Sequence, residues 1–227
     1  MSSQFERTRQ LIGCDAVDKL NKSKVLLFGV GGVGSYVLEA LVRAGVGTVE
    51  IVDKDEVDIT NINRQLIALH STVGRPKVEV AAERMKDINP EANIIARQCF
   101  YLPEKAEEFD FGAYDYVVDA VDNVTAKIDI IVKSKEAGTP VISSMGTGNK
   151  LDPSAFKVAD IEKTKTCPLA KVVRKELRKK GIKDVKVVYS EEEPKEGAGR
   201  TPASISFVPS AAGLLIASAV IGDLIEY

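Results

Sequence analysis

The sequence is poor in residues that form cross-links or metal centres. It has three cysteines, one histidine and no tryptophan among its 227 residues. Cys14, Cys99 and Cys167 are widely spaced and make no CxxC motif, which argues against a disulfide framework and a cysteine-rich zinc site. We expect all three to be ordinary packed or surface residues. A chain of this length buries enough surface to fold without cross-links, and its cysteine usage fits a reducing, cytoplasmic compartment.

Uninterrupted hydrophobic segments are also scarce. The first ten residues, MSSQFERTRQ, are polar and charged and lack the apolar stretch of a secretory signal. Residues 201–222 carry no charge over 22 positions, a length that could cross a bilayer. Pro202, Pro209 and several serines interrupt this segment, so we expect a strand at 205–208 and then a buried helix. Association of this apolar C-terminal segment with a membrane stays an alternative.

No excess of one charge marks the whole chain, because 31 Lys and Arg residues face 33 Asp and Glu residues, a net charge of −2. The overall charge therefore implies no nucleic-acid partner. The local distribution is uneven. Between residues 163 and 186, ten Lys and Arg residues stand against two acids, a local net of +8, whereas seven acids stand against one lysine between 104 and 122. We expect one end of the molecule to be strongly positive.

Apolar runs alternate with helical patterns over the first 145 residues. Strands are expected at 24–30, 48–52, 92–98, 114–119 and 141–144, and the main helices after Gly34 (ending at Gly45), at 77–88 and at 125–137. This order predicts a Rossmann-like, doubly wound α/β fold with a mainly parallel sheet. Beyond residue 145 the alternation breaks. Strands at 156–161 and 184–189, a basic helix at 168–180 and a charged loop at 191–199 are expected there, with antiparallel additions to the sheet.

A glycine-rich motif lies between the first strand and the helix after it. Gly29, Gly31, Gly32 and Gly34 match GxGxxG, and Asp53 follows the last of them by nineteen residues, at the end of the second strand. Glycines let the backbone approach a phosphate, and the helix N-terminus offers free N–H groups. An aspartate at that position accepts hydrogen bonds from a ribose diol. The motif predicts nucleotide binding, with a glycine-rich packing turn as the alternative.

A second polar cluster points beyond a dinucleotide. Asn61, Arg64 and Gln65 belong to the segment NINRQ, and Lys77 opens the next helix. Fixed cations here would stabilise the charge of a triphosphate when its α-phosphorus is attacked. The alternative is that Arg64 and Lys77 are solvated side chains.

Asp122 and Asn123 follow the strand expected at 114–119. A carboxylate at this edge of the sheet suits Mg²⁺, which prefers carboxylate and phosphate oxygens. The alternative is that Asp122 caps the helix that begins there.

Taken together, the segments GVGGVG, NINRQ and VDAVDN with Asp53 and Lys77 resemble the ubiquitin-activating-enzyme-like family of ThiF, MoeB and HesA proteins, which adenylate carboxylates. The likeness runs from about residue 5 to the C-terminus. Further segments, among them FERTRQLIG, SSMGTGNKLDP and PLAKVVRKELRKKGI, are most similar to the branch of the family that dehydrates threonylcarbamoyladenosine in tRNA.

The resemblance implies a role for each matching residue. It implies a single adenylating domain over residues 1–227, with a nucleotide-binding core at 1–145 and substrate-side, closing elements at 146–227. The nucleotide cradle would comprise Gly29, Gly31, Gly32, Gly34, Asp53, Asp55, Asn61, Arg64, Gln65, Lys77, Asp122 and Asn123. Within that set Arg64, Lys77 and Asp122 would be catalytic, with Asp122 associated with the magnesium of ATP. Arg7 would reach into the neighbouring subunit's site, which implies a homodimer.

The activity implied is ATP-dependent adenylation of the threonyl carboxylate, followed by intramolecular cyclisation. Such a reaction needs no cysteine, so the missing CxxC motif favours tRNA over a protein substrate. One alternative is adenylation of the C-terminal glycine of a ubiquitin-like sulfur-carrier protein. Another is an NAD(P)-dependent oxidoreductase, which leaves Arg64, Lys77 and Asp122 unexplained. A non-catalytic nucleotide sensor is a third.

The basic segment fits a tRNA partner. Phosphate contacts from a helical face give affinity without reading sequence. The side chains expected to supply them are Lys171, Arg174, Lys175, Arg178 and Lys179. A merely solvated face is the alternative. A monovalent cation near residues 144–149 and a sulfur-transfer protein partner are left open.

Overall fold

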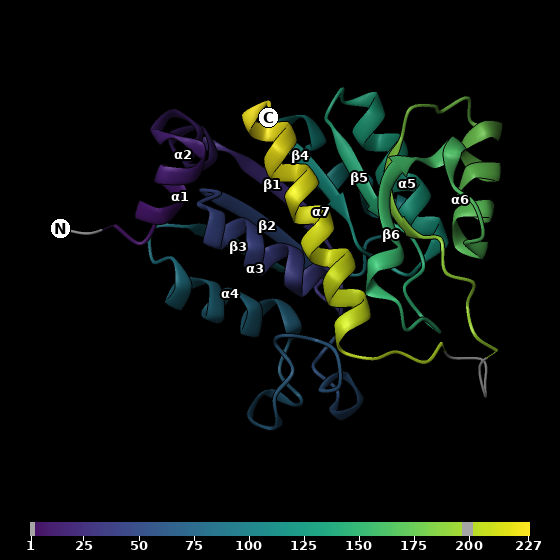
Figure 1. Ribbon diagram of the computed structural model, residues 1–227, viewed down its shortest axis with the longest axis horizontal. Coiled ribbons are helices and arrows are strands. Elements are labelled where there is room, and N and C mark those ends of the chain that lie inside the picture. Colours follow the sequence, from purple (N-terminus) through teal and green to yellow (C-terminus); the bar gives the residue numbers. More distant parts are fainter. Residues whose placement is uncertain (1–2, 197–201) are drawn as a thin grey trace.

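The computed structural model describes residues 3–196 and 202–227, which form one seven-stranded sheet with helices on both faces (Figure 1). The strand order is β3-β2-β1-β4-β5-β7-β6. The strands are β1 (Lys24–Phe28), β2 (Thr48–Asp53), β3 (Asn93–Gln98), β4 (Tyr116–Asp119), β5 (Val141–Ser144), β6 (Phe156–Asp160) and β7 (Lys186–Ser190). Neighbouring strands are parallel except β6 and β7, which confirms the expected fold class, including an antiparallel addition in the C-terminal part.

Two layers of helix cover the sheet. The helices are α1 (Glu6–Ile12), α2 (Cys14–Lys22), α3 (Gly34–Ala44), α4 (Lys77–Ile88), α5 (Val124–Glu136), α6 (Pro168–Lys179) and α7 (Phe207–Ile225). Successive residues of a strand point to opposite faces. Val25 and Leu27 therefore pack with α3, α4 and α7, whereas Leu26 and Phe28 pack with α5 and α6. This two-sided burial explains why β1 is an unbroken apolar run.

The ligand-binding edge of such a sheet follows from its topology. From β1 the chain runs outward to β2 and β3, and then returns to β4 on the other side of β1. The loops after β1 and β4 therefore diverge and leave a crevice at the carboxyl ends of the strands. Farther along the sheet, β7 pairs directly with β5, so a single sheet runs through both the expected core and the C-terminal part.

One expectation about the C-terminal segment is wrong. The strand expected at 205–208 is absent, because Phe207 and Val208 already belong to the first turn of α7. Pro209 is the third residue of this helix, where its missing N–H costs no intrahelical bond. The loop expected at 191–199 has neither helix nor strand at 191–196, and its last three residues lie outside the described part.

Helix α7 packs closely on α3. Its buried residues Val208, Ala212, Ile216 and Val220 recur every four positions and face the core. A Cβ at Gly213 would lie 2.5 Å from the carbonyl oxygen of Val33, so only glycine allows the two helices this approach. Within the described residues, α7 is also the one helix that is long and apolar enough to cross a membrane.

Candidate active site

A cavity of about 630 Å³ opens at the carboxyl ends of β1, β2, β4 and β5. We divide it into two parts. The nucleotide half is lined by the glycine loop, the ends of β2 and β4 and the segments around them. It includes Gly29, Gly31, Gly32, Asp53, Asp55, Asn61, Arg64, Gln65, Lys77, Asp122 and Asn123. The far half is lined by residues 144–150, Cys167, Pro168, Leu169, Pro194, Pro202 and Ser204. The structure thus brings together nearly all the residues predicted for the nucleotide.

The glycine loop is shaped by close backbone contacts. Gly29 has φ = +88°, and a Cβ there would lie 2.7 Å from the carbonyl oxygen of Ala120. A Cβ at Gly34 would lie 1.8 Å from the carbonyl oxygen of Gly29, which no side chain tolerates. Gly31 differs, because its Cβ would meet nothing closer than the Gln65 side chain at 3.8 Å. Two of these glycines are therefore required by the fold, while Gly31 leaves open space in the cavity.

Asp53 holds the glycine loop against the end of β2. Its carboxylate accepts the N–H of Val30 at 2.7 Å and the N–H of Asp55 at 2.9 Å. The carboxylate remains partly exposed in the cavity wall. Each carboxylate oxygen accepts more than one hydrogen bond, so Asp53 can brace the loop and still accept a ligand hydroxyl.

Lys77 and Asp55 form an ion pair at the floor of the nucleotide half. The Lys77 Nζ lies 3.0 Å from Oδ2 of Asp55, and the lysine side chain is 7% exposed whereas that of Asp55 is 48% exposed. Partial burial raises the pKa of Asp55, but the hydrogen bond and charge of Lys77 outweigh it, so this pKa lies below its usual value. Lys77 retains two ammonium donors for an anionic ligand.

The segment NINRQ presents three side chains with different degrees of freedom. Asn61 accepts the N–H of Asp58 and is committed to the short 3-10 turn Ile59–Asn61. Arg64 donates to the carbonyl of Thr60 and to the Asn63 side chain, and no carboxylate within the described residues pairs with it. The Gln65 side chain is buried, and its Oε1 has no hydrogen-bond partner in the described part of the chain. Arg64 and Gln65 thus have capacity left for a ligand.

Asp122 and Asn123 follow the end of β4 and have different roles. Asn123, not Asp122, is the N-cap of α5, because its Oδ1 accepts the N–H of Ala126 at 3.0 Å. Asp122 is exposed in the cavity wall and makes no side-chain hydrogen bond to the described residues. Within those residues no group of three His, Cys, Asp or Glu side chains is placed to hold a metal. A single carboxylate fits an ion whose other ligands are phosphate oxygens.

A buried cluster beneath this loop was not anticipated from the sequence. Lys127 donates to Oδ2 of Asp119 at 2.6 Å, to Ser143 at 3.3 Å and to the carbonyl of Ser144 at 2.9 Å. The other oxygen of Asp119 accepts the N–H of Val121 at 3.1 Å. One signal was available: Lys127 shares a helical face with the buried Ile130 and Ile131, an unusual place for a lysine. The cluster ties the loops after β4 and β5 together.

Arg7 lies outside this cavity. It is on α1, which packs against α2 at the left of Figure 1, and it is not among the residues that line the cavity of its own chain. Its contribution to a neighbouring subunit's site stays a prediction.

The basic helix α6 is less free than its sequence suggests. Arg174 is half-buried and donates to the carbonyl of Thr164 at 2.9 Å and to that of Ile161 at 3.3 Å, so it anchors the helix to the preceding turn. Arg178 pairs with Glu162, and Lys179 pairs with Glu176 at 2.7 Å. Lys171 and Lys175 are exposed and form no ion pair within the described residues. Of the five side chains predicted to contact tRNA, Arg174 is thus a packing residue.

The comparisons with known proteins agree with this geometry. The model of the ThiF family matches residues 5–226. A tRNA threonylcarbamoyladenosine dehydratase of Bacillus subtilis is 48% identical, over 100% of this chain and 96% of the relative. The dehydratase of Escherichia coli is 37% identical over 77% of this chain and 65% of the relative.

Solved structures extend the likeness to the fold. The crystal structure of the E. coli dehydratase TcdA in complex with AMP has a TM-score of 0.93 at 32% identity, and covers 98% of this chain and 94% of the other. The complex of the same protein with ATP has a TM-score of 0.92, with the same identity and coverage. The family match and the full-length relative lead to one conclusion: the chain belongs to the ThiF family.

Proposed function

We propose that this protein uses ATP to adenylate the threonyl carboxylate of threonylcarbamoyladenosine in tRNA, and then closes the product into its cyclic form. The observation that carries the proposal is the full-length likeness to tRNA threonylcarbamoyladenosine dehydratases, one of which has solved structures with ATP and with AMP. The cavity supports it, since a glycine loop and the cations Lys54, Arg64 and Lys77 line one half and the far half adjoins it. A tRNA substrate also fits the cytoplasmic location expected from the cysteine usage.

In the first step, a carboxylate oxygen attacks the α-phosphorus of ATP. The bond from that phosphorus to the bridging oxygen breaks, and pyrophosphate leaves with the electron pair. Arg64 and Lys77 line the nucleotide half and keep donors free, so they are suited to stabilise the charge that gathers on the phosphoryl oxygens. The ribose hydroxyls would bond to Asp53.

In the second step, the carbamoyl group of the same substrate attacks the new acyl carbon. The bond from that carbon to the phosphate oxygen breaks, AMP leaves, and the attacking group releases a proton. The substrate has then lost the elements of one water molecule, with the oxygen carried away on AMP. The attack is intramolecular, so the chain needs to hold the adenylate in a folded conformation and exclude water, and needs no nucleophile of its own.

Magnesium is part of the proposal. Asp122 is exposed at the cavity wall without a protein partner among the described residues, which suits it to hold Mg²⁺ together with the phosphate oxygens. When bound, the ion neutralises charge on the triphosphate. Asp122→Asn should lower the affinity for ATP measured with magnesium and leave the affinity measured with EDTA unchanged. An equal loss under both conditions would remove the assignment.

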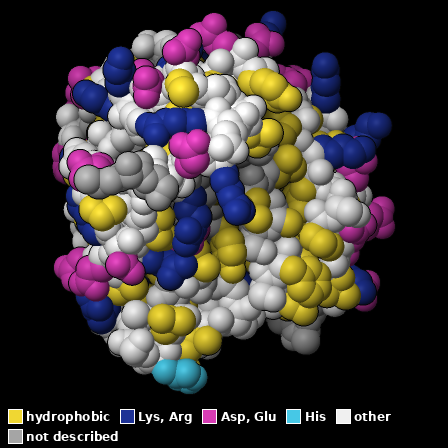
Figure 2. Space-filling model, turned by 60° about the vertical axis from the view of Figure 1, so that its left-hand side comes forward, with side chains coloured by type: hydrophobic (Ala, Val, Ile, Leu, Met, Phe, Trp, Pro, Cys, Tyr) yellow, Lys and Arg dark blue, Asp and Glu magenta, His cyan; other side chains and the backbone are white. Residues whose placement is uncertain are grey.

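The proposal also includes a homodimer in which each active site contains residues of both subunits. Arg7 does not line the cavity of its own chain, and apolar side chains such as Leu11 on α1 and Leu214 on α7 are exposed and available for a subunit contact. Figure 2 brings the left-hand side of Figure 1 forward and shows hydrophobic side chains gathered in a band on the face toward the viewer. Mixing inactive Arg7→Ala and Lys77→Ala subunits should restore activity, because one site of the mixed dimer is intact. No recovery after subunit exchange would place Arg7 outside the site.

The exposed lysines of α6 are the proposed tRNA contacts. Lys171 and Lys175 have no ion-pair partner in the described residues, and Lys179 pairs only with the partly exposed Glu176. Replacing these three by alanine should weaken tRNA binding and reduce its dependence on salt, because each phosphate contact releases counterions. ATP affinity should stay unchanged. An unaltered salt dependence would show that tRNA binds elsewhere.

The direct test follows the nucleoside. The protein is incubated with ATP, magnesium and tRNA that carries threonylcarbamoyladenosine, and the digested nucleoside is weighed by mass spectrometry. We expect loss of one water mass, with one AMP and one pyrophosphate released for each nucleoside converted. The matched control is Arg75→Ala, an exposed residue just before Lys77 that pairs with Glu83. Pyrophosphate exchange stimulated by a sulfur-carrier protein and not by tRNA would instead select the protein substrate.

A further inference from the structure

Among the described residues, one charged side chain lines the far half of the cavity. Residues 144–149 and the neighbouring Cys167, Pro168 and Leu169 are small, apolar or neutral, as are Pro194, Pro202 and Ser204. Lys150 is the exception among the described lining residues of this half. It follows β5, whereas the other cations that line the cavity, Lys54, Arg64 and Lys77, follow β2, at the other end of the cavity. Within the described part of the chain, a single cation therefore stands in the part of the site that the nucleotide motifs do not account for.

The ammonium of Lys150 makes no direct ion pair within the described residues. Its side chain is buried, with 4% of the residue exposed, and its Nζ donates to one acceptor, the carbonyl of Glu192. No carboxylate of the described residues lies within 4.0 Å of this nitrogen, and residues 1–2 and 197–201 include no Asp or Glu. An ammonium carries three donors, and burying it unpaired is costly. An anionic ligand would remove that cost.

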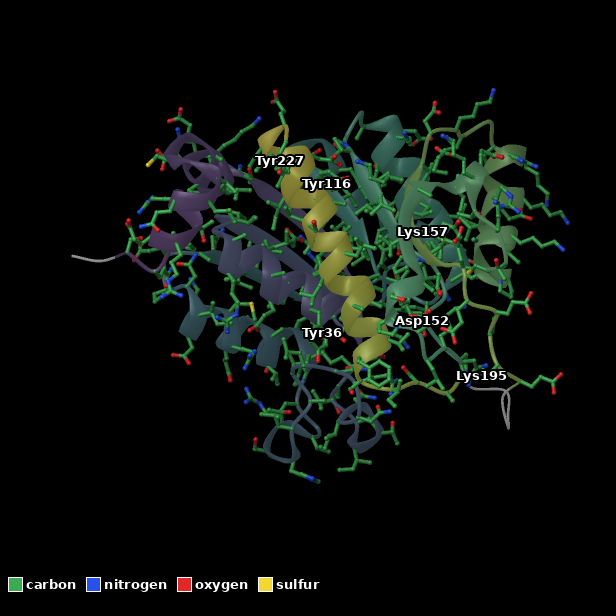
Figure 3. The ribbon with its side chains drawn as sticks, viewed as in Figure 1. Tyr36, Tyr116, Asp152, Lys157, Lys195 and Tyr227 are labelled. Carbon is green, nitrogen blue, oxygen red and sulfur yellow. The ribbon has the colours of Figure 1, made fainter. Side chains whose placement is uncertain are left out.

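The backbone around Lys150 is held from both sides. Asn149 has φ = +59°, its N–H donates to the carbonyl of Ala203 at 2.8 Å, and its Oδ1 accepts the N–H of Ala203 at 2.7 Å. The carbonyl of Asn149 accepts the N–H of Lys195 at 2.7 Å. Figure 3 shows Asp152 and Lys195 on the two segments concerned, at the lower right beyond the foot of α7. These hydrogen bonds fix the position of the backbone from which the Lys150 side chain extends.

The carboxylate of Glu192 braces the same backbone. It accepts the N–H of Leu151 at 2.9 Å and that of Asp152 at 2.9 Å, and it makes no direct ion pair with Lys150. Lys150 is therefore preorganised by contacts made without any ligand. Preorganised donors lose little freedom on binding, which strengthens the contact.

We infer that Lys150 binds the carboxylate of the tRNA-borne substrate and holds it in the far half, facing the α-phosphorus. The inference rests on the proposed function, in which the substrate brings one carboxylate to a site already crowded with phosphate charge. Arg64 and Lys77 lie with the nucleotide, so the carboxylate needs a cation of its own to approach. The same tRNA without the threonylcarbamoyl group offers Lys150 nothing to bind.

The test measures binding without reaction. The nucleotide half is filled with an ATP analogue that has a methylene group between its α- and β-phosphorus, so pyrophosphate cannot leave. Affinity is measured for tRNA with and without the modification. The wild-type protein should prefer the modified tRNA. Lys150→Met should weaken binding of modified tRNA by about ten- to a hundredfold, as expected for loss of one charged hydrogen bond, with unmodified tRNA and the analogue each within about twofold.

Two controls keep the outcome interpretable. Lys150→Arg, which keeps the charge, should retain most of the preference, and the exposed Lys22→Met should retain all of it. The inference is overturned if the wild type does not discriminate between the tRNAs, if Lys150→Met weakens both tRNAs equally, or if it weakens the ATP analogue instead. Failure of the proposed function itself appears separately, as wild-type protein that prefers the modified tRNA but does not convert it with ATP.

Discussion

Two lysine–aspartate pairs at one edge of the sheet differ in what their charges are free to do. Lys127 and Asp119 lie 2.6 Å apart with both side chains fully buried, and all three ammonium donors of the lysine are used. Lys77 and Asp55 lie 3.0 Å apart, but the aspartate is 48% exposed and the lysine borders the cavity. The first pair has no capacity left for a ligand, whereas the second does. Burial and donor count, more than distance, separate a structural pair from a binding one.

Breaking the buried pair should have the largest effect on stability. Asp119→Ala leaves the ammonium of Lys127 inside the protein without a counter-ion, which should lower the free energy of unfolding by about 3–5 kcal/mol in urea denaturation. Replacing both residues by leucine should cost less than the single change, because no charge is then buried alone. A loss below about 1 kcal/mol for Asp119→Ala would mean that water or a rearranged neighbour satisfies Lys127.

Breaking the cavity pair should affect catalysis and leave the fold largely intact. Lys77→Met keeps the aliphatic stem and removes the charge, so the free energy of unfolding should change by less than about 1 kcal/mol. Turnover of ATP with modified tRNA should fall by about a hundredfold or more, since one preorganised donor to the transition state is lost. Arg75→Ala, with its exposed partner Glu83, should change neither quantity. Near-normal turnover of Lys77→Met would remove the lysine from the mechanism.

Two residues of the glycine loop, Gly34 and Gly31, show the same contrast between a structural position and a ligand-binding position, without any charge. Gly34→Ala forces a Cβ into the carbonyl of Gly29, and should destabilise the protein by about 1–3 kcal/mol or prevent folding. In Gly31→Ala the new Cβ lies no closer than 3.8 Å to any described protein atom, so the melting temperature should stay unchanged. Its methyl group fills space beside the bound phosphates, and ATP affinity measured by calorimetry should fall about tenfold, the loss of roughly one hydrogen bond. Unchanged ATP affinity would mean that the phosphates lie away from Gly31.

The sequence predicted the nucleotide half well because its signals are local. Helix α4 begins at Lys77 and ends at Ile88 as expected, since a proline precedes it and Asn89 and Pro90 stop it. The strand ends that deliver Asp53 and Asp122 follow from alternating elements and the right-handed crossovers of parallel sheets. Membership of the ThiF family followed from several short motifs taken together.

The far half was predicted less well because its contacts join distant segments. Asn149 is hydrogen-bonded to Ala203 and Lys195, about fifty positions away, and no helical or strand periodicity in the sequence predicts these bonds. The segment 205–208 suggested a strand, although its last two residues form the first turn of α7, which packs on α3. Arg174 belongs to the basic face of α6 by sequence, yet the turn at 161–164 captures its guanidinium. Such outcomes depend on neighbours that only the folded chain supplies.

The smallest expected effect is the pH dependence of the Lys77–Asp55 pair. Burial raises the pKa of Asp55, but Lys77 lowers it further, so folding favours the ionised carboxylate. Its contribution to stability is complete above the pKa of an unfolded aspartate, about 4, and is lost as the pH falls through the lower pKa of the folded state. The difference in free energy of unfolding between wild type and Lys77→Met should therefore be constant from pH 7 to about 4.5 and shrink towards pH 3. Because Asp55 is half exposed, that difference is at most about 1 kcal/mol. A difference that grew on acidification would contradict the pairing and would point to Lys77 as a destabilising charge that the cavity tolerates for its ligand.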